Sequence, residues 1–381
     1  MRLRSALLAA SLACALAAPA SALAASDYNK LDAEIERLRT AGKIPGVAVA
    51  VIDNGKVAHV VAKGVRNEKG DPLTPDTIMY AASLTKTTFS YYVLMLVNDG
   101  KLDLDRPISV YLPKPLPEYP RYADLAVDER WKTITLRRLL THSSGLADQR
   151  FYDPENKFRF NLEPGTRYAY SNEGVNLAQF VIEEGLGLKV GDEMNRRIFQ
   201  PLGMTRSSMI WRDDFKGNLA NGVDQNGKWE PHDDRSSVKA AGSLDSTISD
   251  MAKLAAAMVS GWGLSPKTRA ELSKASFPIV SQAQFPPFLI KDNPDNAKIG
   301  LAAGIGVVVY DGPQGRVFFK GGHNDITDNH VSCVEKGKRC VVLLSNSGVG
   351  QRIYPSLVKA ALGELGAPWP WEYSRQLPVE P

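Results

Sequence analysis

Ser83 and Lys86 have the residue types and the spacing of a serine nucleophile activated by a lysine. A serine hydroxyl is a weak nucleophile at neutral pH and needs a base within hydrogen-bond reach. Residues three apart lie on one face of a helix, so the Lys86 amine can reach the Ser83 hydroxyl there. Apolar residues at helical spacing predict such a helix: Phe89, Val93, Leu96 and Val97.

Two further polar motifs follow in the chain. Residues 170–172 read Tyr-Ser-Asn and begin 87 positions after Ser83 (170 − 83), before a predicted helix. Residues 320–323 read Lys-Gly-Gly-His and begin 150 positions later (320 − 170), at the end of a predicted strand. Each motif also has an ordinary interpretation when taken alone. Tyr170 then belongs to the core, Asn172 caps a helix, and the lysine at the strand end is solvated.

The elements that must position these motifs are strands at both ends of the chain. Residues 47–52 are continuously apolar, with valines on one face and alanines on the other, which predicts a strand covered on both sides. The turn Asp-Asn-Gly at 53–55 predicts a hairpin that returns over residues 56–62. Four more strand-like runs lie near the other end, at 305–310, 316–320, 330–334 and 340–345.

The middle of the chain is predicted to be helical. Helices are expected at 134–140, 175–184, 192–199 and 247–260, with a last one at 353–362. We therefore predict an α+β fold with one antiparallel sheet built from both chain ends and flanked by helices. The sheet domain is expected over 25–82 and 298–381, and a mainly helical inserted domain over 83–297, with the active site at their interface. Residues 281–297, which are rich in proline, are expected to form a surface loop.

The N-terminus predicts export. Arg2 and Arg4 precede an apolar run, and Ala-Leu-Ala at 22–24 is a typical cleavage site, so residues 1–24 are interpreted as a secretory signal peptide. The protein is then periplasmic or secreted, and no later segment is apolar and long enough to span a bilayer. Losing two arginines takes the formal net charge from +4 to +2, which gives no reason to expect nucleic acid as a partner.

Cys333 and Cys340 are the cysteines that remain after the predicted cleavage. The intervening residues 335–338 resemble a hairpin turn, which places the two side chains on facing arms. In an oxidising compartment they can form a disulfide, and two free thiols are the alternative. The spacing is a poor zinc signature, and the five histidines are scattered, so no metal is predicted.

Taken in order, the three motifs resemble those of the penicillin-recognising serine hydrolases, which include class C β-lactamases, DD-carboxypeptidases of related fold and β-lactamase-like esterases. Tyr-Ser-Asn resembles the Tyr-x-Asn variant, so the class C side is the closer match. Four framework segments strengthen the resemblance and spread it over nearly the whole mature chain: 44–47, 139–146, 164–166 and 201–204.

The resemblance implies a role for each motif residue. Ser83 would be the nucleophile, Lys86 its proton partner, and Tyr170 the general base, as a phenolate favoured by the charges of Lys86 and Lys320. Asn172 would orient the substrate amide and Lys86. Lys320 would hold an anionic group or stabilise Tyr170.

The last motif would complete the substrate site. The resemblance implies an oxyanion hole made by the backbone N–H groups of Ser83 and His323, with Gly321 and Gly322 beside it. Gly321 departs from the usual threonine or serine, whose hydroxyl helps to bind a substrate carboxylate, and this weakens the case for β-lactam hydrolysis. His142, in the framework segment 139–146, is expected to be structural.

The sequence therefore predicts a secreted serine hydrolase that cleaves an ester or amide through an acyl-enzyme on Ser83. Its substrate would be a small molecule or a peptidoglycan-like peptide, with no cofactor and a monomeric enzyme. A true β-lactamase or a D-Ala-D-Ala carboxypeptidase is the alternative within the class. A penicillin-binding receptor without turnover is the alternative outside it, although such a receptor does not need the deacylation base Tyr170.

Overall fold

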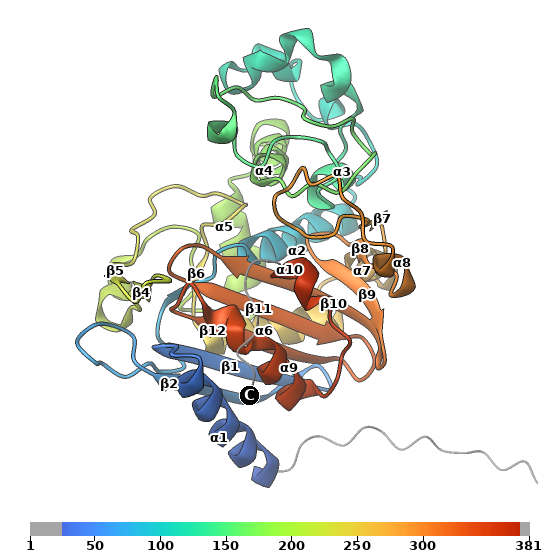
Figure 1. Ribbon diagram of the computed structural model, residues 1–381. Coiled ribbons are helices and arrows are strands. Elements are labelled where there is room, and N and C mark those ends of the chain that lie inside the picture. The colour runs from blue at the N-terminus through green and yellow to red at the C-terminus, as the bar shows by residue number, and fades with distance from the viewer. Residues whose placement is uncertain (1–24, 374–381) are drawn as a thin grey trace, which may run out of the picture.

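The computed structural model describes residues 25–373, which form an α+β fold around one antiparallel sheet (Figure 1). The expected signal peptide, residues 1–24, lies outside the described residues. The eight strands stand in the order β2-β1-β12-β11-β10-β9-β8-β7. Their bounds in that order are Lys56–Gly64, Gly46–Asp53, Arg339–Ser345, Asp328–Val334, Gly315–His323, Val308–Gly312, Ala302–Ala303 and Phe277–Pro278.

Ten α-helices lie within the described residues, and none of them is long and apolar enough to cross a membrane. In order, α1 to α10 span Ala25–Ala41, Leu84–Asn98, Leu136–Leu140, Asn172–Leu186, Val190–Met194, Ile248–Ser260, Pro266–Ser273, Asp295–Lys298, Tyr354–Leu362 and Trp369–Glu372. Two short two-stranded pairs stand apart from the sheet: β3 (Met79–Tyr80) with β6 (Asp245–Ser246), and β4 (Gly222–Val223) with β5 (Trp229–Glu230).

The sheet is built from both ends of the chain, as the sequence predicts. β1 pairs antiparallel with β2 on one side and with β12 on the other, where Val47 faces Ser345. The turn between β1 and β2 has Asn54 at φ 50° and Gly55 at φ 72°, the left-handed pair that a tight two-residue hairpin needs. The predicted α+β architecture is therefore confirmed.

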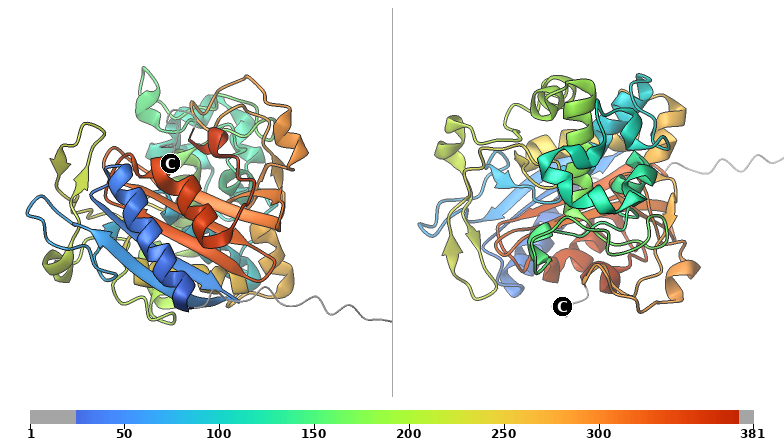
Figure 2. Two further views of the ribbon diagram at one scale, coloured as in Figure 1. Left: turned by 60° about the horizontal axis from the view of Figure 1, so that its bottom comes forward. Right: turned by 90° about the horizontal axis from the view of Figure 1, so that it is seen from above.

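The alternation in β1 decides which helices cover which face. Val47, Val49 and Val51 belong to the core that α1 and α9 cover, whereas Ala48 and Ala50 face the core on the side of α6. Figure 2 shows α1 and α9 lying side by side across one face of the sheet. The small alanine side chains leave room for α6, which contacts β1, β2 and β12.

The helical part of the chain stands at one end of the sheet, with α3 and α4 packed together (Figure 1). The helix expected at 134–140 is shorter, because Thr135 caps it and α3 starts only at Leu136. The segment 83–297, expected to form the helical domain, also contributes elements to the sheet part of the molecule. It contributes α6 to one face and β7 to the sheet edge.

Residues 281–297 are only partly the surface loop that the sequence predicts. Ser281 and Gln284 are buried, and the last part of the segment begins the short helix α8. The reason is the C-terminal segment, which packs on it: the indole N–H of Trp371 donates to Ser281 Oγ, and the backbone N–H of Gln284 donates to the carbonyl of Trp371. The expectation of a simple surface loop was wrong because this partner lies more than seventy residues further on.

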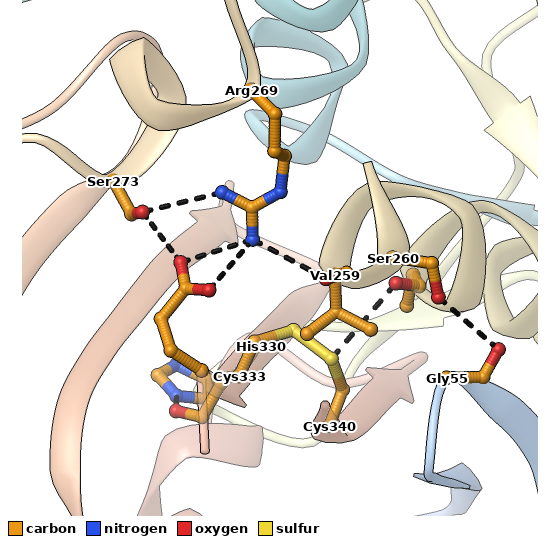
Figure 3. The surroundings of a disulfide bond; sticks show 11 residues. Gly55, Val259, Ser260, Arg269, Ser273, His330, Cys333 and Cys340 are labelled. Carbon is orange, nitrogen blue, oxygen red and sulfur yellow. Dashed lines mark hydrogen bonds and ion pairs between the residues drawn. A yellow bond between two sulfur atoms is a disulfide. The ribbon is translucent and has the colours of Figure 1, made fainter. Parts of the chain in front are cut away.

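Cys333 on β11 and Cys340 on β12 form a disulfide beneath α6 (Figure 3). The two residues face each other in the ladder with Cα atoms 4.1 Å apart. Nearby, Arg269 of α7 forms an ion pair with Glu335, the residue that follows β11. The disulfide therefore closes the hairpin that carries β11 to β12.

Candidate active site

Ser83 lies at the start of α2, directly after a tight backbone turn. Ala82 has φ 47°, a left-handed conformation that is rare for a residue with a side chain, and Ser83 occupies the N-cap position. The helix behind it is buried on all sides from Leu84 to Leu96. A buried helix of this kind supports Ser83 rigidly, while the residue itself stays partly exposed.

Lys86 lies one helical turn from Ser83 and points at its hydroxyl, as the spacing predicts. Its Nζ lies 2.9 Å from Ser83 Oγ, 2.5 Å from Asn172 Oδ1 and 2.6 Å from the carbonyl oxygen of Ala241. The side chain is only 1% exposed. Three polar neighbours and near-complete burial fix the amine in a single position.

Tyr170 joins the same group from the loop before α4. Its hydroxyl lies 2.8 Å from Ser83 Oγ, and the amines of Lys86 and Lys320 lie 4.9 and 5.0 Å from the centre of its ring. The structure thus brings together all three residues predicted to be catalytic, together with Lys320. Ser171, and not Asn172, is the residue that caps α4, by accepting from the N–H of Gly174.

The protonation of these groups differs from the sequence-based expectation. Burial, followed by the charge of Lys320, lowers the pKa of Lys86 well below its usual range. Burial raises the pKa of Tyr170 well above its usual range, although its hydrogen bond to Ser83 acts in the opposite direction. The raised pKa of Tyr170 favours the neutral phenol over the phenolate that the sequence predicts, because burial is the largest influence on it. Lys86 is the group whose neutral form the site favours.

Asp148 is a positioning residue that sequence reasoning missed. One carboxylate oxygen accepts from both the backbone N–H and the side-chain amide of Asn172, at 3.1 and 2.7 Å. The pair of bonds turns the amide so that its carbonyl oxygen faces Lys86. Only its place two residues after the framework segment 139–146 hints at this role in the sequence.

His142 has the structural position expected for it. Its ring stacks on Tyr170 with centroids 4.4 Å apart, and its Nδ1 accepts from the backbone N–H of Ser171. Burial, followed by the charges of Lys320 and Lys86, lowers its pKa well below the usual value. A neutral ring therefore supports the Tyr170 side chain without adding charge.

Strand β10 passes directly beside the start of α2. A Cβ atom on Gly322 would lie 3.0 Å from the backbone nitrogen of Ser83, so only glycine permits this approach. β11 pairs with β10 through His323, whereas β9 pairs with it only as far as Phe319. The outer edge of Lys320–His323 therefore has no partner strand among the described residues, and an extended substrate can lie along it.

Two residues that sequence reasoning missed flank this edge. Phe285 packs between Tyr170 and His323, with ring centroids 5.1 and 5.8 Å away. The carboxyl of Glu372 occupies the space beside Gly321, where a Cβ atom would lie 2.1 Å from Glu372 Oε1. Neither lies near the motifs in sequence, so no local pattern could have indicated them. Within residues 25–373, no three His, Cys, Asp or Glu side chains gather as metal ligands do.

Ser83 thus lies within hydrogen-bond distance of a buried lysine and of a tyrosine, the kind of groups expected at the nucleophile of a serine hydrolase. A profile of the family described as Beta-lactamase matches residues 31–361, and the chain belongs to that family. The predicted resemblance to β-lactamases, DD-carboxypeptidases and esterases of this fold is thereby confirmed.

Named relatives span several activities. Penicillin-binding protein 4 of Amycolatopsis lactamdurans is 26% identical, covering 89% of this chain and 90% of its own length. Lovastatin esterase of Penicillium rubens is 29% identical over 50% of this chain and 56% of its own length. The crystal structure of D-alanine carboxypeptidase AmpC from Burkholderia cenocepacia superposes with a TM-score of 0.69 at 19% identity, covering 89% of this chain and 99% of that chain. The last similarity shows the fold alone.

Proposed function

We propose that this protein is an exported serine hydrolase that cleaves an ester or amide through an acyl-enzyme on Ser83. The observation that carries the proposal is the position of Ser83 Oγ within 2.9 Å of Lys86 Nζ and 2.8 Å of the Tyr170 hydroxyl. A nucleophile that touches both a base and an acid has what acyl transfer needs.

Acylation follows from these contacts. Ser83 Oγ attacks the carbonyl carbon, and its proton passes to the neutral Lys86 amine. The carbonyl oxygen becomes an oxyanion, which the backbone N–H groups of Ser83 and His323 would stabilise. The bond to the leaving group then breaks, the Tyr170 hydroxyl gives its proton to the leaving atom, and Lys86 returns a proton to Tyr170.

Deacylation reverses the roles. A water attacks the acyl carbon and its proton passes through Tyr170 to Lys86, after which the Ser83 oxygen leaves and is reprotonated. Asn172, held by Asp148, keeps the Lys86 amine aligned. The second N–H of its amide would be the group that orients the substrate. No cofactor is needed for any of these proton transfers.

A D-Ala-D-Ala carboxypeptidase or a penicillin-binding function is the second candidate, since Penicillin-binding protein 4 matches nearly the whole chain. Gly321 supplies no hydroxyl to bind a substrate carboxylate, and the carboxyl of Glu372 lies beside it. We therefore favour a neutral ester or amide as the substrate. A receptor without turnover would not need the proton path through Tyr170.

The test is replacement and labelling of Ser83. Ser83→Ala should abolish hydrolysis of a short-chain aryl ester while the melting temperature stays near that of the wild type. Ser90→Ala, on the same helix but outside the catalytic group, is the matched control. A fluorophosphonate should label Ser83 in mass spectra. Labelling of another serine in the wild type, with Ser83 unmodified, would overturn the proposal.

We further propose that the enzyme acts as a periplasmic or secreted monomer. The basic residues and apolar run before residue 25 support export. A precursor and a shorter mature form in fractionated cells would test export, and light scattering of the mature enzyme would test its oligomeric state.

A further inference from the structure

The carboxyl group of Glu372 is buried at the substrate edge of β10. Its side chain is 4% exposed, and Oε2 accepts from Gln284 Nε2 at 2.6 Å. Oε1 lies against the backbone of Gly321, in the volume that any side chain at that position would fill. The chain thus carries a carboxyl of its own beside Gly321.

The C-terminal segment holds this carboxyl in place. Trp371 packs against Tyr168 and donates to Ser281, and the hydroxyl of Tyr373 lies 3.1 Å from His330 Nδ1. Helix α10, which ends at Glu372, lies near the end of the sheet that faces the helical part (Figure 1). Contacts on both sides of Glu372 therefore fix its position.

Burial is the largest influence on the pKa of both Glu372 and Lys320, and the charge of each opposes the shift of the other. Burial lowers the pKa of Lys320, and the charge of Glu372 opposes that shift. Burial raises the pKa of Glu372, and Lys320, Gln284 and the N–H of Gly321 oppose that shift. The carboxyl of Glu372 thus adds oxygen acceptors and no cationic group at Gly321, which reduces the attraction that Lys320 offers to an anion there.

A substrate that lies along the free edge of Lys320–His323 must pass this pair. An anionic group close enough to be held by Lys320 would also face the carboxyl of Glu372 in a buried setting, where repulsion is only weakly screened. A neutral amide or ester group meets no such repulsion. The carboxyl of Glu372 would therefore discriminate between substrates by their charge and not by their size alone.

We propose that Glu372 is a specificity-determining residue, which makes the enzyme select substrates that carry no negative charge beside the scissile bond. This inference rests on the proposed acyl transfer at Ser83. It assigns a substrate class to the site: neutral esters and amides, in preference to the same compounds with a carboxylate on the leaving group.

A matched pair of thioesters tests the inference. N-acetyl-D-alanyl thioglycolate and the corresponding thioglycolamide share one scissile bond and differ only in a terminal carboxylate or amide. The wild type should prefer the amide, and Glu372→Gln should raise the ratio of kcat/KM for carboxylate over amide by about tenfold or more. Glu372→Asp, which keeps the charge, should retain most of the wild-type preference.

Glu364→Gln is the matched control, because Glu364 is an exposed carboxylate on the same C-terminal segment. It should leave the ratio within about twofold. Glu372→Ala replaces the glutamine variant if the latter shows no cooperative unfolding.

An unchanged ratio in a folded Glu372 variant would overturn the inference while leaving the acyl-enzyme intact. Loss of all turnover together with absence of label on Ser83 would instead overturn the proposed function. A wild type that labels on Ser83 but prefers the carboxylate would also reject the inference.

The structure also changes what Gly321→Thr should do. Alone, the new side chain would collide with Glu372, so both thioesters should be hydrolysed more slowly. The double variant Gly321→Thr with Glu372→Ala should have a higher ratio of kcat/KM for carboxylate over amide than Glu372→Ala alone. Improvement of the carboxylate substrate by Gly321→Thr alone would contradict this account.

Discussion

At the scale of single residues, the hydrogen bonds of Lys86 explain how a lysine can act as a base. A neutral amine has two N–H donors and one lone pair. Asn172 Oδ1 and the carbonyl of Ala241 can accept the two N–H groups, which leaves the lone pair directed at the hydroxyl of Ser83. The contacts therefore suit the neutral form that burial favours.

This arrangement predicts the pH dependence of catalysis. Because the folded pKa of Lys86 is lowered, the active neutral form becomes populated as the pH rises through that lowered value. We expect kcat/KM for a neutral aryl ester to rise from acidic to neutral pH. Lys86→Arg should lose activity by about 10²–10⁴-fold at every pH, because a guanidinium keeps its proton.

Tyr170→Phe provides the comparison. It should slow turnover, while the acidic limb of the pH profile stays where it is, because Lys86 still sets it. A limb that disappears or moves in Tyr170→Phe would show that the tyrosine is the titrating base, as the sequence-based expectation had it.

Sequence reasoning found the residues that lie in contiguous motifs and missed those that do not. Ser83, Lys86 and Tyr170 are marked by order and spacing, and the structure brings them together. Asp148 and Glu372 act only through folding, which carries them to Asn172 and Gly321 from distant positions. The protonation of Tyr170 was also inaccessible, because burial cannot be counted before the fold is known.

At the scale of elements, the hairpin of β11 and β12 carries the disulfide between Cys333 and Cys340. A link that closes so short a loop restricts the unfolded chain only modestly. Replacing both cysteines by alanine should lower the free energy of unfolding by up to about 2–3 kcal/mol, measured by denaturant unfolding.

Reductant serves as the control for that variant. It should destabilise the wild type and leave the double variant unchanged. Two free thiols in the unreduced, denatured wild type would show that the bond does not form in solution.

The elements themselves were predictable where the hydrophobic pattern is strong and local. The alternation of valine and alanine in β1 indicates both a buried strand and the close approach of α6, and both are found. The prediction of a surface loop at 281–297 failed because the proline content of this segment suggests exposure. In the structure Trp371 and Glu372 bury part of it. A partner supplied by the far end of the chain leaves no local signal.

At the scale of the whole molecule, we expect His330 to make stability depend on pH. It is buried on β11 between Ser332 and Tyr373. Burial, followed by the charge of Lys320, lowers its pKa to about 3.

The unfolded chain binds this proton near pH 6.5 and the folded chain only near pH 3, so acid favours unfolding across that window. We expect the melting temperature to fall as the pH drops from about 6.5 to 3, and His330→Gln to flatten the fall. Differential scanning calorimetry at several pH values measures both curves. Parallel curves for variant and wild type would mean that other groups govern acid sensitivity.

The pairing of β1 with β12 has a consequence for how the protein is made. Val47 cannot pair with Ser345 until that residue has been synthesised, 298 residues later (345 − 47). At ordinary rates of synthesis this delay is about 15–60 s. β2 can cover one edge of β1 early, but the other edge stays open and apolar on the nascent chain. We expect that edge to need a holding chaperone until β12 arrives, and for the proposed export the same delay would keep the chain unfolded before translocation.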